Sequence, residues 1–146
     1  MTTASNAAPS RGRTLAWIAL GAALLFTGTA HLTFARETFR AQVPSWFPMD
    51  VDLVVLLSGV VELALGLGLL LARARRRQVG WLTAAFFVAI FPGNVAQWLE
   101  QRDAFGLDSD GARLARLFFQ PVLIIWALWS TGAVVRRPGR PLTPRP

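Results

Sequence analysis

Long apolar runs separated by short polar segments dominate the pattern along this chain. Four runs are each about 20 residues long, which as a helix is enough to cross a hydrocarbon core of ~30 Å. We place them at residues 14–34, 52–72, 79–99 and 114–135. The first run is longer than the apolar part of a cleaved signal peptide, and no clear cleavage site follows it. The pattern therefore predicts an all-α fold, a four-transmembrane-helix bundle with short loops.

Proline and arginine mark the connections between these runs. Residues 35–51 are predicted to be an irregular connection, because Pro44 and Pro48 restrain the backbone away from a helix. Four arginines within residues 73–77 end the second run abruptly. Pro92 is expected to break the third run at its glycine neighbour.

The distribution of charge predicts the orientation. Residues 1–13 hold two arginines, residues 73–77 four and residues 136–146 four, and a protein with four spans places these ten on one side. The other side, residues 35–51 and 100–116, holds five arginines and six of the eight acidic residues, and a seventh, Asp52, adjoins it at the start of the second run. By the positive-inside rule, the two polar tails are cytoplasmic, and their composition predicts that they are disordered. We expect a multi-pass protein of the plasma membrane.

Composition excludes several kinds of chemistry. The chain is 53% hydrophobic with a mean hydropathy of +0.44. Its net charge of +7 comes from arginines that cluster at the ends of apolar runs, so we expect lipid and no nucleic acid as its partner. It has no cysteine, no tyrosine and one histidine. Disulfides, thiol relays, iron–sulfur ligation and a haem with two histidine ligands from one chain are thereby excluded.

One acidic residue, Glu62, falls near the middle of the second run, roughly 15 Å from its start. An ionised carboxylate at that depth costs several kcal/mol, so it must pair, take up a proton or face a wet cavity. Ser58, Gly59 and Gly66 share its helix face, which predicts that this face meets other helices and not lipid. A simpler interpretation is that Glu62 only hydrogen-bonds to a neighbouring helix.

Further polar residues lie in the outer half of the other three runs. His31 is one turn from the end of the first, Asn94 and Gln97 follow Pro92 in the third, and Arg116 and Gln120 lie near the start of the fourth. Each has a simpler explanation, such as water contact for His31 or capping for Arg116 and Gln120. Taken together they predict a polar pocket that opens toward the outer side. Its candidate residues are His31, Ser58, Glu62, Asn94, Gln97, Arg116 and Gln120.

The order of these features resembles the DoxX-like family of membrane proteins across roughly residues 14–132. The matching features are His31 at the end of the first span, Val43-Pro44 with Pro48, Ser58-Gly59-Val60 through Glu62 to Gly66 and Gly68, Phe91-Pro92 with Asn94, and Arg116-Leu117 with Gln120 through Trp126 to Trp129. The sequence departs from the family pattern at Leu32, Gly93 and Phe118, with Pro121 shifted to follow Gln120. The resemblance implies a four-helix membrane bundle and an association with quinone-linked oxidoreductases.

Three functions remain open at this stage. The first is a non-catalytic accessory protein or subunit of a membrane oxidoreductase, which fits the missing redox side chains. The second is a protein that binds a lipophilic molecule such as a quinone or a lipid around Glu62, with Glu62 and His31 exchanging protons. The third is a small transporter, which needs a homo-oligomer because four helices per chain are few. No catalytic residue and no metal ligand set is identified, and a quinone is the one cofactor suggested.

Overall fold

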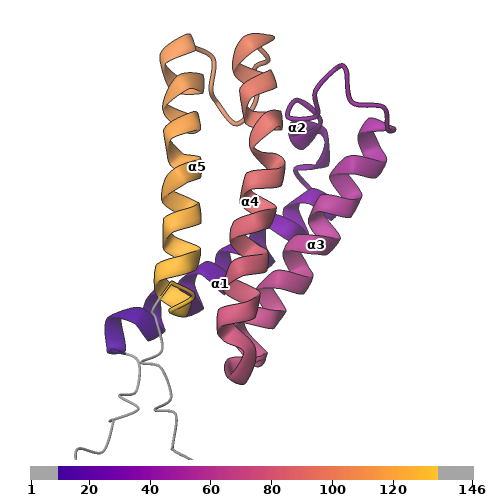
Figure 1. Ribbon diagram of the computed structural model, residues 1–146. Coiled ribbons are helices and arrows are strands. Elements are labelled where there is room, and N and C mark those ends of the chain that lie inside the picture. Colours follow the sequence, from indigo (N-terminus) through magenta and orange to yellow (C-terminus); the bar gives the residue numbers. More distant parts are fainter. Residues whose placement is uncertain (1–9, 135–146) are drawn as a thin grey trace, which may run out of the picture.

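The computed structural model describes residues 10–134, and every regular element in that range is a helix. Figure 1 shows four long helices and two short ones. They are α1 (Arg11–Leu32), α2 (Arg36–Arg40), α3 (Val51–Leu71), the 3₁₀ helix η1 (Arg73–Arg75), α4 (Arg76–Leu99) and α5 (Asp110–Thr131). The helices α1, α3, α4 and α5 are long and apolar enough to cross a membrane. The predicted all-α fold with four spans is confirmed.

Polar caps explain where α3 and α5 begin. The Asp50 carboxylate accepts a hydrogen bond from the Leu53 backbone N–H at 3.0 Å, and the Ser109 hydroxyl accepts one from Ala112 at 3.3 Å. Each cap satisfies an N–H that has no partner within its helix. At the other end of α5, Gly132 adopts a left-handed conformation with φ of 70°, which ends the helix.

The first and last helices begin earlier than the hydropathy pattern predicts. Residues 11–13, expected to belong to a disordered tail, form the first turn of α1. The fourth span begins at Asp110 rather than at residue 114, because Ser109 caps a polar first turn that hydropathy alone does not detect. Residues 1–9 and 135–146, which hold most of the two predicted tails, lie outside the described range.

The connections also differ from expectation. Pro92 does not break the third span, since α4 continues through it to Leu99. Residues 36–40 of the expected irregular connection form the short helix α2, whereas the segment that contains Pro44 and Pro48 is not helical. The expected basic loop 73–77 is itself helical, as η1 and the first residues of α4.

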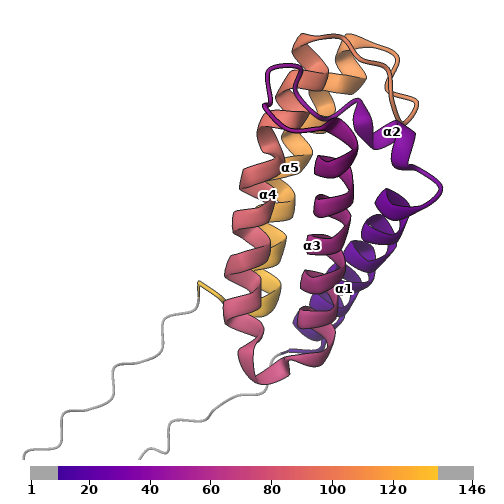
Figure 2. The ribbon, with the colours of Figure 1, turned by 90° about the vertical axis from the view of Figure 1, so that its right-hand side faces the viewer.

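The helices α1 and α3 run antiparallel and touch through four glycines (Figure 2). A Cβ atom on Gly28 would lie 2.8 Å from the Gly59 carbonyl oxygen, and one on Gly66 would lie 2.9 Å from the Gly21 carbonyl oxygen. Such distances leave no space for a side chain. Small residues at these positions let the two backbones approach, which is the usual basis of close helix packing in membranes.

The helices α4 and α5 form a second antiparallel pair. Gly80 of α4 faces the buried side chain of Thr131 at the end of α5, with no space for a Cβ atom between them. The two pairs meet in an apolar core to which all four long helices contribute. Its buried members are Leu20, Leu24, Leu65, Leu69, Ala84, Phe87 and Ala127.

The two pairs contact each other near the end of the bundle that contains η1. There the indole N–H of Trp126 donates to the Ala16 carbonyl at 2.9 Å, which links α5 to α1. A Cβ atom on Gly68 of α3 would lie 3.2 Å from Val79 of α4, close to η1. Toward the other end α3 and α4 separate (Figure 1), and the segment after α2 reaches α4 there, with the Gln42 backbone against Gly93.

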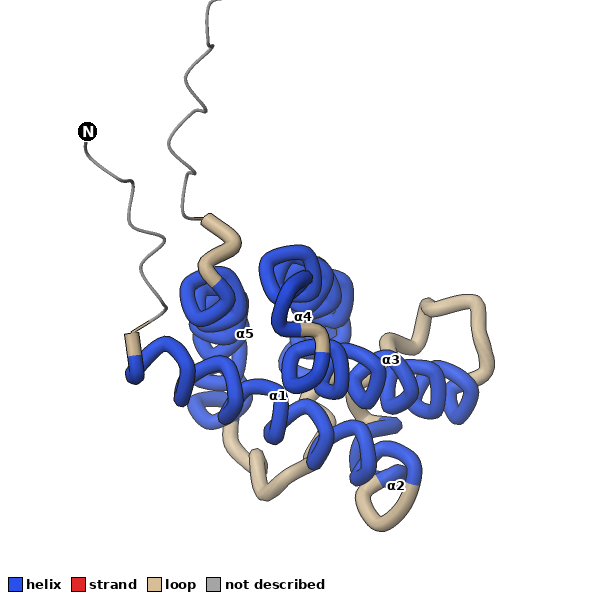
Figure 3. The backbone as a smooth tube through the Cα atoms, turned by 90° about the horizontal axis from the view of Figure 1, so that it is seen from below, coloured by secondary structure: helices blue, strands red, loops and turns tan. Residues whose placement is uncertain are grey.

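The bundle has two chemically different ends. The arginine end, shown facing the viewer in Figure 3, holds the start of α1, η1, the start of α4 and the end of α5. The loop end holds α2, residues 41–50 and residues 100–109. Large apolar side chains are exposed along the helices between the two ends, among them Leu15, Phe26, Phe118 and Ile125. With four apolar helices of spanning length, this surface is that of a protein that lies in a lipid bilayer.

We predict that Gly59→Ala destabilises the protein by about 1–3 kcal/mol, because its methyl group would overpack the interface between α1 and α3. The new Cβ atom would lie 2.8 Å from His31 Cβ and 3.0 Å from the Gly28 carbonyl oxygen. Reversible unfolding in mixed detergent micelles measures the change. Gly12→Ala in α1 is the matched control, since a Cβ atom there meets nothing within 4 Å. Equal stability of the two variants would contradict the prediction.

Candidate functional site

A cavity of about 580 Å³ lies between the two helix pairs, toward the loop end. The helices α1 and α3 form one wall, and α4 and α5 form the facing wall. Residues 41–49, which we call the cover segment, pass over the cavity at the loop end and contribute several lining residues, among them Gln42, Val43 and Pro44. The part of the cavity toward the arginine end is apolar, and the part toward the loop end contains the polar side chains.

The wall formed by α1 and α3 brings His31 and Glu62 together. His31 Nδ1 lies 2.8 Å from the Thr27 carbonyl oxygen and 3.2 Å from Glu62 Oε2. Because a carbonyl oxygen only accepts, the contact with Thr27 places a proton on Nδ1. Both side chains are about nine-tenths buried. Glu62 Oε2 has no well-directed hydrogen-bond donor among residues 10–134, so this wall presents an acceptor that is not fully satisfied.

The opposite wall is a chain of satisfied amides. The Gln120 side-chain N–H donates to the Phe87 carbonyl at 2.6 Å, and the Asn94 N–H donates to Gln120 Oε1 at 2.9 Å. Pro92 removes the helical donor of the Val88 carbonyl, four residues earlier, so Gln120 binds the carbonyl that precedes it in α4. The hydrogen bond joins α5 to α4 inside the bundle.

Arg116 extends this network to the cover segment. Its Nε donates to Asn94 Oδ1 at 3.3 Å, and its guanidinium also contacts the Gln42 amide. A guanidinium has only donors, so the Gln42 oxygen faces it and accepts from Nε at 3.0 Å. The backbone of Gln42 packs directly on Gly93, where a Cβ atom would collide with the Gln42 carbonyl oxygen. Gly93, one of the departures from the DoxX-like pattern, therefore lets the cover segment rest on α4.

Residues 100–102 fasten the cover segment from the other side. Arg102 Nη1 donates to the Val43 carbonyl at 2.8 Å, and Arg102 Nη2 lies 2.5 Å from Glu100. The Ser45 hydroxyl donates to Glu100 Oε1 at 3.0 Å. This hydrogen bond lowers the pKa of Glu100 below its ordinary value, and the charge of Arg102 acts in the same direction.

Aromatic rings connect the two walls across the loop end. The Phe39 ring of α2 stacks on His31, with centroids 3.4 Å apart and an angle of 18° between the planes. Phe105 packs edge-on against Phe39 at 4.8 Å, and the Arg116 guanidinium lies 5.1 Å from the Phe105 ring centre. Phe105 has a left-handed backbone with φ of 57°, a conformation that costs a bulky residue about 1–3 kcal/mol. The fold therefore maintains this ring at the loop end despite local strain.

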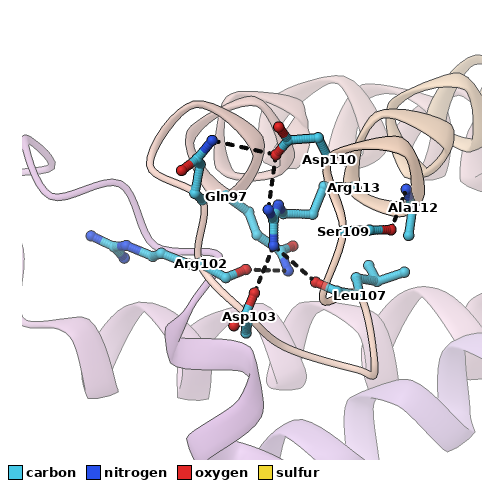
Figure 4. Close-up of polar contacts among 9 residues, drawn as sticks. Gln97, Arg102, Asp103, Leu107, Ser109, Asp110, Ala112 and Arg113 are labelled. Carbon is cyan, nitrogen blue, oxygen red and sulfur yellow. Dashed lines mark hydrogen bonds and ion pairs between the residues drawn. The ribbon is translucent and has the colours of Figure 1, made fainter.

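Arg113 organises the loop that presents Phe105 (Figure 4). Its guanidinium donates to Asp103 at 2.6 Å, to Asp110 at 2.8 Å and to the Leu107 carbonyl at 3.2 Å. Only 7% of the Arg113 side chain is exposed. A buried guanidinium with several acceptors fixes the path of residues 103–110.

Six of the seven residues predicted for the pocket line this cavity: His31, Ser58, Glu62, Asn94, Arg116 and Gln120. Gln97 does not line it. It is buried beside the cavity, with its amide 3.3 Å from that of Gln42 and a hydrogen bond to the Arg102 carbonyl. Sequence reasoning missed Gln42, Phe39 and Phe105, which sit in connections without a periodic pattern. Arg113 could have been predicted from the sequence, because it is a basic residue three positions after Asp110, in the first turns of a span.

No group of three metal-ligating side chains occurs within residues 10–134. The polar groups of the cavity are hydrogen-bond donors and acceptors: a carboxylate and an imidazole on one wall, amides and a guanidinium on the other. Such a set can orient a polar head group and exchange a proton with it.

Fold and cavity define this protein as a four-helix membrane bundle with an internal site between two helix pairs. The family model described as "Domain of unknown function (DUF8561)" matches residues 20–131, and the chain belongs to that family. No curated protein and no solved structure matches the chain. The matched range contains every residue that lines the cavity.

We predict that Gln120→Leu lowers the free energy of unfolding by about 1–2 kcal/mol, because the Phe87 carbonyl and the Asn94 amide both lose their partner in an apolar environment. Unfolding in mixed micelles again provides the measurement. Gln78→Leu, the same change at an exposed position of α4, is the control and should leave stability nearly unchanged. A loss of similar size in both variants would refute the role assigned to Gln120.

We also predict a pH-dependent contribution from Glu100. A carboxyl group whose pKa is lowered by folding stabilises the protein above its ordinary pKa, and loses that effect as the pH falls through the lowered value. The difference in unfolding free energy between the wild type and Glu100→Gln should therefore shrink as the solution is acidified. Unfolding measured at a series of pH values tests this, and a difference that does not change with pH would contradict it.

Proposed function

We propose that this protein binds a lipophilic small molecule of the quinone or lipid class in the cavity between its helix pairs. One observation supports this most directly: the cavity of about 580 Å³ is apolar toward the arginine end and polar toward the loop end. An amphiphile with a hydrocarbon part and a polar head matches that division. The volume lies within the range of about 300–1,000 Å³ that is typical of small-molecule sites.

The apolar part suits a hydrocarbon chain or ring. Its lining includes Leu20, Leu24, Phe87, Leu123 and Trp126. These side chains come from α1, α4 and α5, so a ligand there would contact both helix pairs. Burial of apolar surface would provide most of the affinity, at roughly 25 cal/mol per Å².

The polar part suggests the chemistry of the head group. Glu62 needs a hydrogen-bond donor or a cation, whereas Arg116 on the facing wall offers donors only. A head that donates on one side and accepts on the other would satisfy both walls. A quinol or quinone ring has this character, and so does a lipid head with a hydroxyl and a carbonyl group. His31, next to Glu62, is positioned to share a proton at the same point.

A second proposal comes from the resemblance to DoxX-like proteins, namely that the chain is an accessory protein or subunit of a quinone-linked membrane oxidoreductase. A bound quinone would be consistent with both proposals, since such a subunit would hold the molecule for a catalytic partner. No particular contact in the structure favours a transporter or a homo-oligomer, and these stay predictions. We do not assign a catalytic residue.

We further propose that the arginine end faces the cytoplasm and that the membrane is the plasma membrane. The support for the orientation is the ratio of ten arginines to five described above. The basic end would also attract anionic lipid head groups, at about 1 kcal/mol per arginine near the surface.

Native mass spectrometry of gently solubilised protein tests the binding proposal. We expect a bound lipophile in the wild type and about tenfold lower occupancy in Glu62→Gln, since the loss of one hydrogen bond to the ligand costs about 1.4 kcal/mol at that ratio. His31→Ala should also lower occupancy.

Glu37→Gln provides the matched control, because it makes the same chemical change at an exposed acid and should retain the ligand. A wild-type protein without any bound molecule would contradict the proposal. A redox enzyme that co-purifies equally with wild type and Glu62→Gln would favour the accessory role instead.

A further inference from the structure

We infer that the ligand enters the cavity sideways from the bilayer, through an opening between α3 and α4, and that it is therefore a molecule dissolved in the membrane. This inference rests on the proposed binding function and adds the route of access and the physical class of the ligand.

The opening is defined by side chains that both line the cavity and reach the outer surface of the bundle. Leu57 and Val61 of α3 are 47% and 40% exposed, and Ala89 of α4 is also exposed. All three line the cavity. We call these three residues the mouth. They are apolar, and they lie near the middle of helices that are long enough to span a membrane. A passage at this depth opens into hydrocarbon and not into water.

The packing of the helices explains why the opening lies here. The glycine contacts hold α3 against α1, and Gly80 holds α4 against Thr131 of α5. Between α3 and α4 the contact near Gly68 and Val79 is close to their connection, and the helices separate beyond it (Figure 1). The separation produces the cavity and leaves it open along this line.

At the loop end the cover segment lies over the cavity. Val43 and Pro44 are buried, and Gln42 is fastened to Arg116 and seated on Gly93. The exposed residues of the same segment that line the cavity are Trp46, Phe47 and Met49, all apolar. A water-soluble ligand would find no polar path among these side chains, so lateral entry differs from the prediction made from the sequence, in which the pocket opens toward the outer side.

The mouth is continuous with the polar site. Val61 precedes Glu62, and Leu57 precedes Ser58, which is one turn from Glu62 and lines the cavity. A molecule that enters tail-last from the bilayer would place its head beside Glu62 and its ring or the first part of its chain in the apolar part of the cavity, while the rest of the chain extends through the mouth into the lipid. The fitting partner is thus a lipophile with one small polar head and a long hydrocarbon tail, because such a tail does not need to be enclosed.

The absence of cysteine from the sequence allows a direct test with single thiols. Ser58→Cys places one thiol on the cavity wall of protein held in lipid nanodiscs. We expect an alkyl maleimide dissolved in the lipid to label this thiol, and a charged, water-soluble methanethiosulfonate to leave it unlabelled. Adding Ala89→Phe should fill the mouth and lower the rate of maleimide labelling about tenfold.

Two controls make the outcome decisive. Ala85→Phe makes the same change at an exposed position of α4 that does not line the cavity, and it should leave the labelling rate unchanged. Asp108→Cys, in the exposed loop between α4 and α5, reports whether the charged reagent is active, and circular dichroism reports whether Ala89→Phe retains its helices. Labelling of Ser58→Cys by the charged reagent at the rate of Asp108→Cys would overturn lateral access. So would equal rates in the two phenylalanine variants. The labelling does not depend on a bound ligand, so it can fail or succeed separately from the mass spectrometry.

Discussion

The close approach of α1 and α3 is the constraint on which the rest of the structure depends. In a bilayer there is no hydrophobic force between helices, so contact requires surfaces that fit closely. Gly28 and Gly59 provide that fit. The carbonyl oxygen of each glycine occupies the space that a side chain on the other glycine would need. The same approach places His31 directly over Gly59 and within 3.2 Å of Glu62. The packing contact therefore positions the acidic site.

Tight packing within each pair determines where the cavity forms. A helix held against its own partner by glycine cannot also follow the surface of the other pair along its full length. The pairs meet in the core around Leu69 and Phe87 and separate toward the loop end. At the loop end the cover segment passes over this space and is held in place by hydrogen bonds, such as those of Arg102 and Ser45, and not by helix packing. The opening between α3 and α4 is apolar where lipid can reach it.

Hydropathy was sufficient to predict the four spans, because a helix in lipid must be apolar along its length. The depth of Glu62 followed from counting residues. The direction of each side chain did not, since it depends on how helices rotate against one another. This is why Gln97, one turn from Asn94, was predicted to line the pocket. In the structure Gln97 lies beside the pocket. The connection residues Gln42 and Phe105 were missed because loops have no period, and the hydrogen bond from Gln120 to the Phe87 carbonyl could not be predicted because it joins two helices.

The two walls of the cavity differ in how their buried polar groups are hydrogen-bonded. Polar groups in a membrane interior are tolerated when they satisfy one another, as Asn94, Gln120 and the Phe87 carbonyl do. If packing were the only demand, Glu62 would be satisfied in the same manner or replaced by an apolar residue at a gain in stability. Instead its Oε2 atom is left with a poorly directed contact to a histidine that already donates to its own helix. An unsatisfied acceptor beside an open, apolar passage is costly in the empty protein, and a ligand with a donor group would remove that cost.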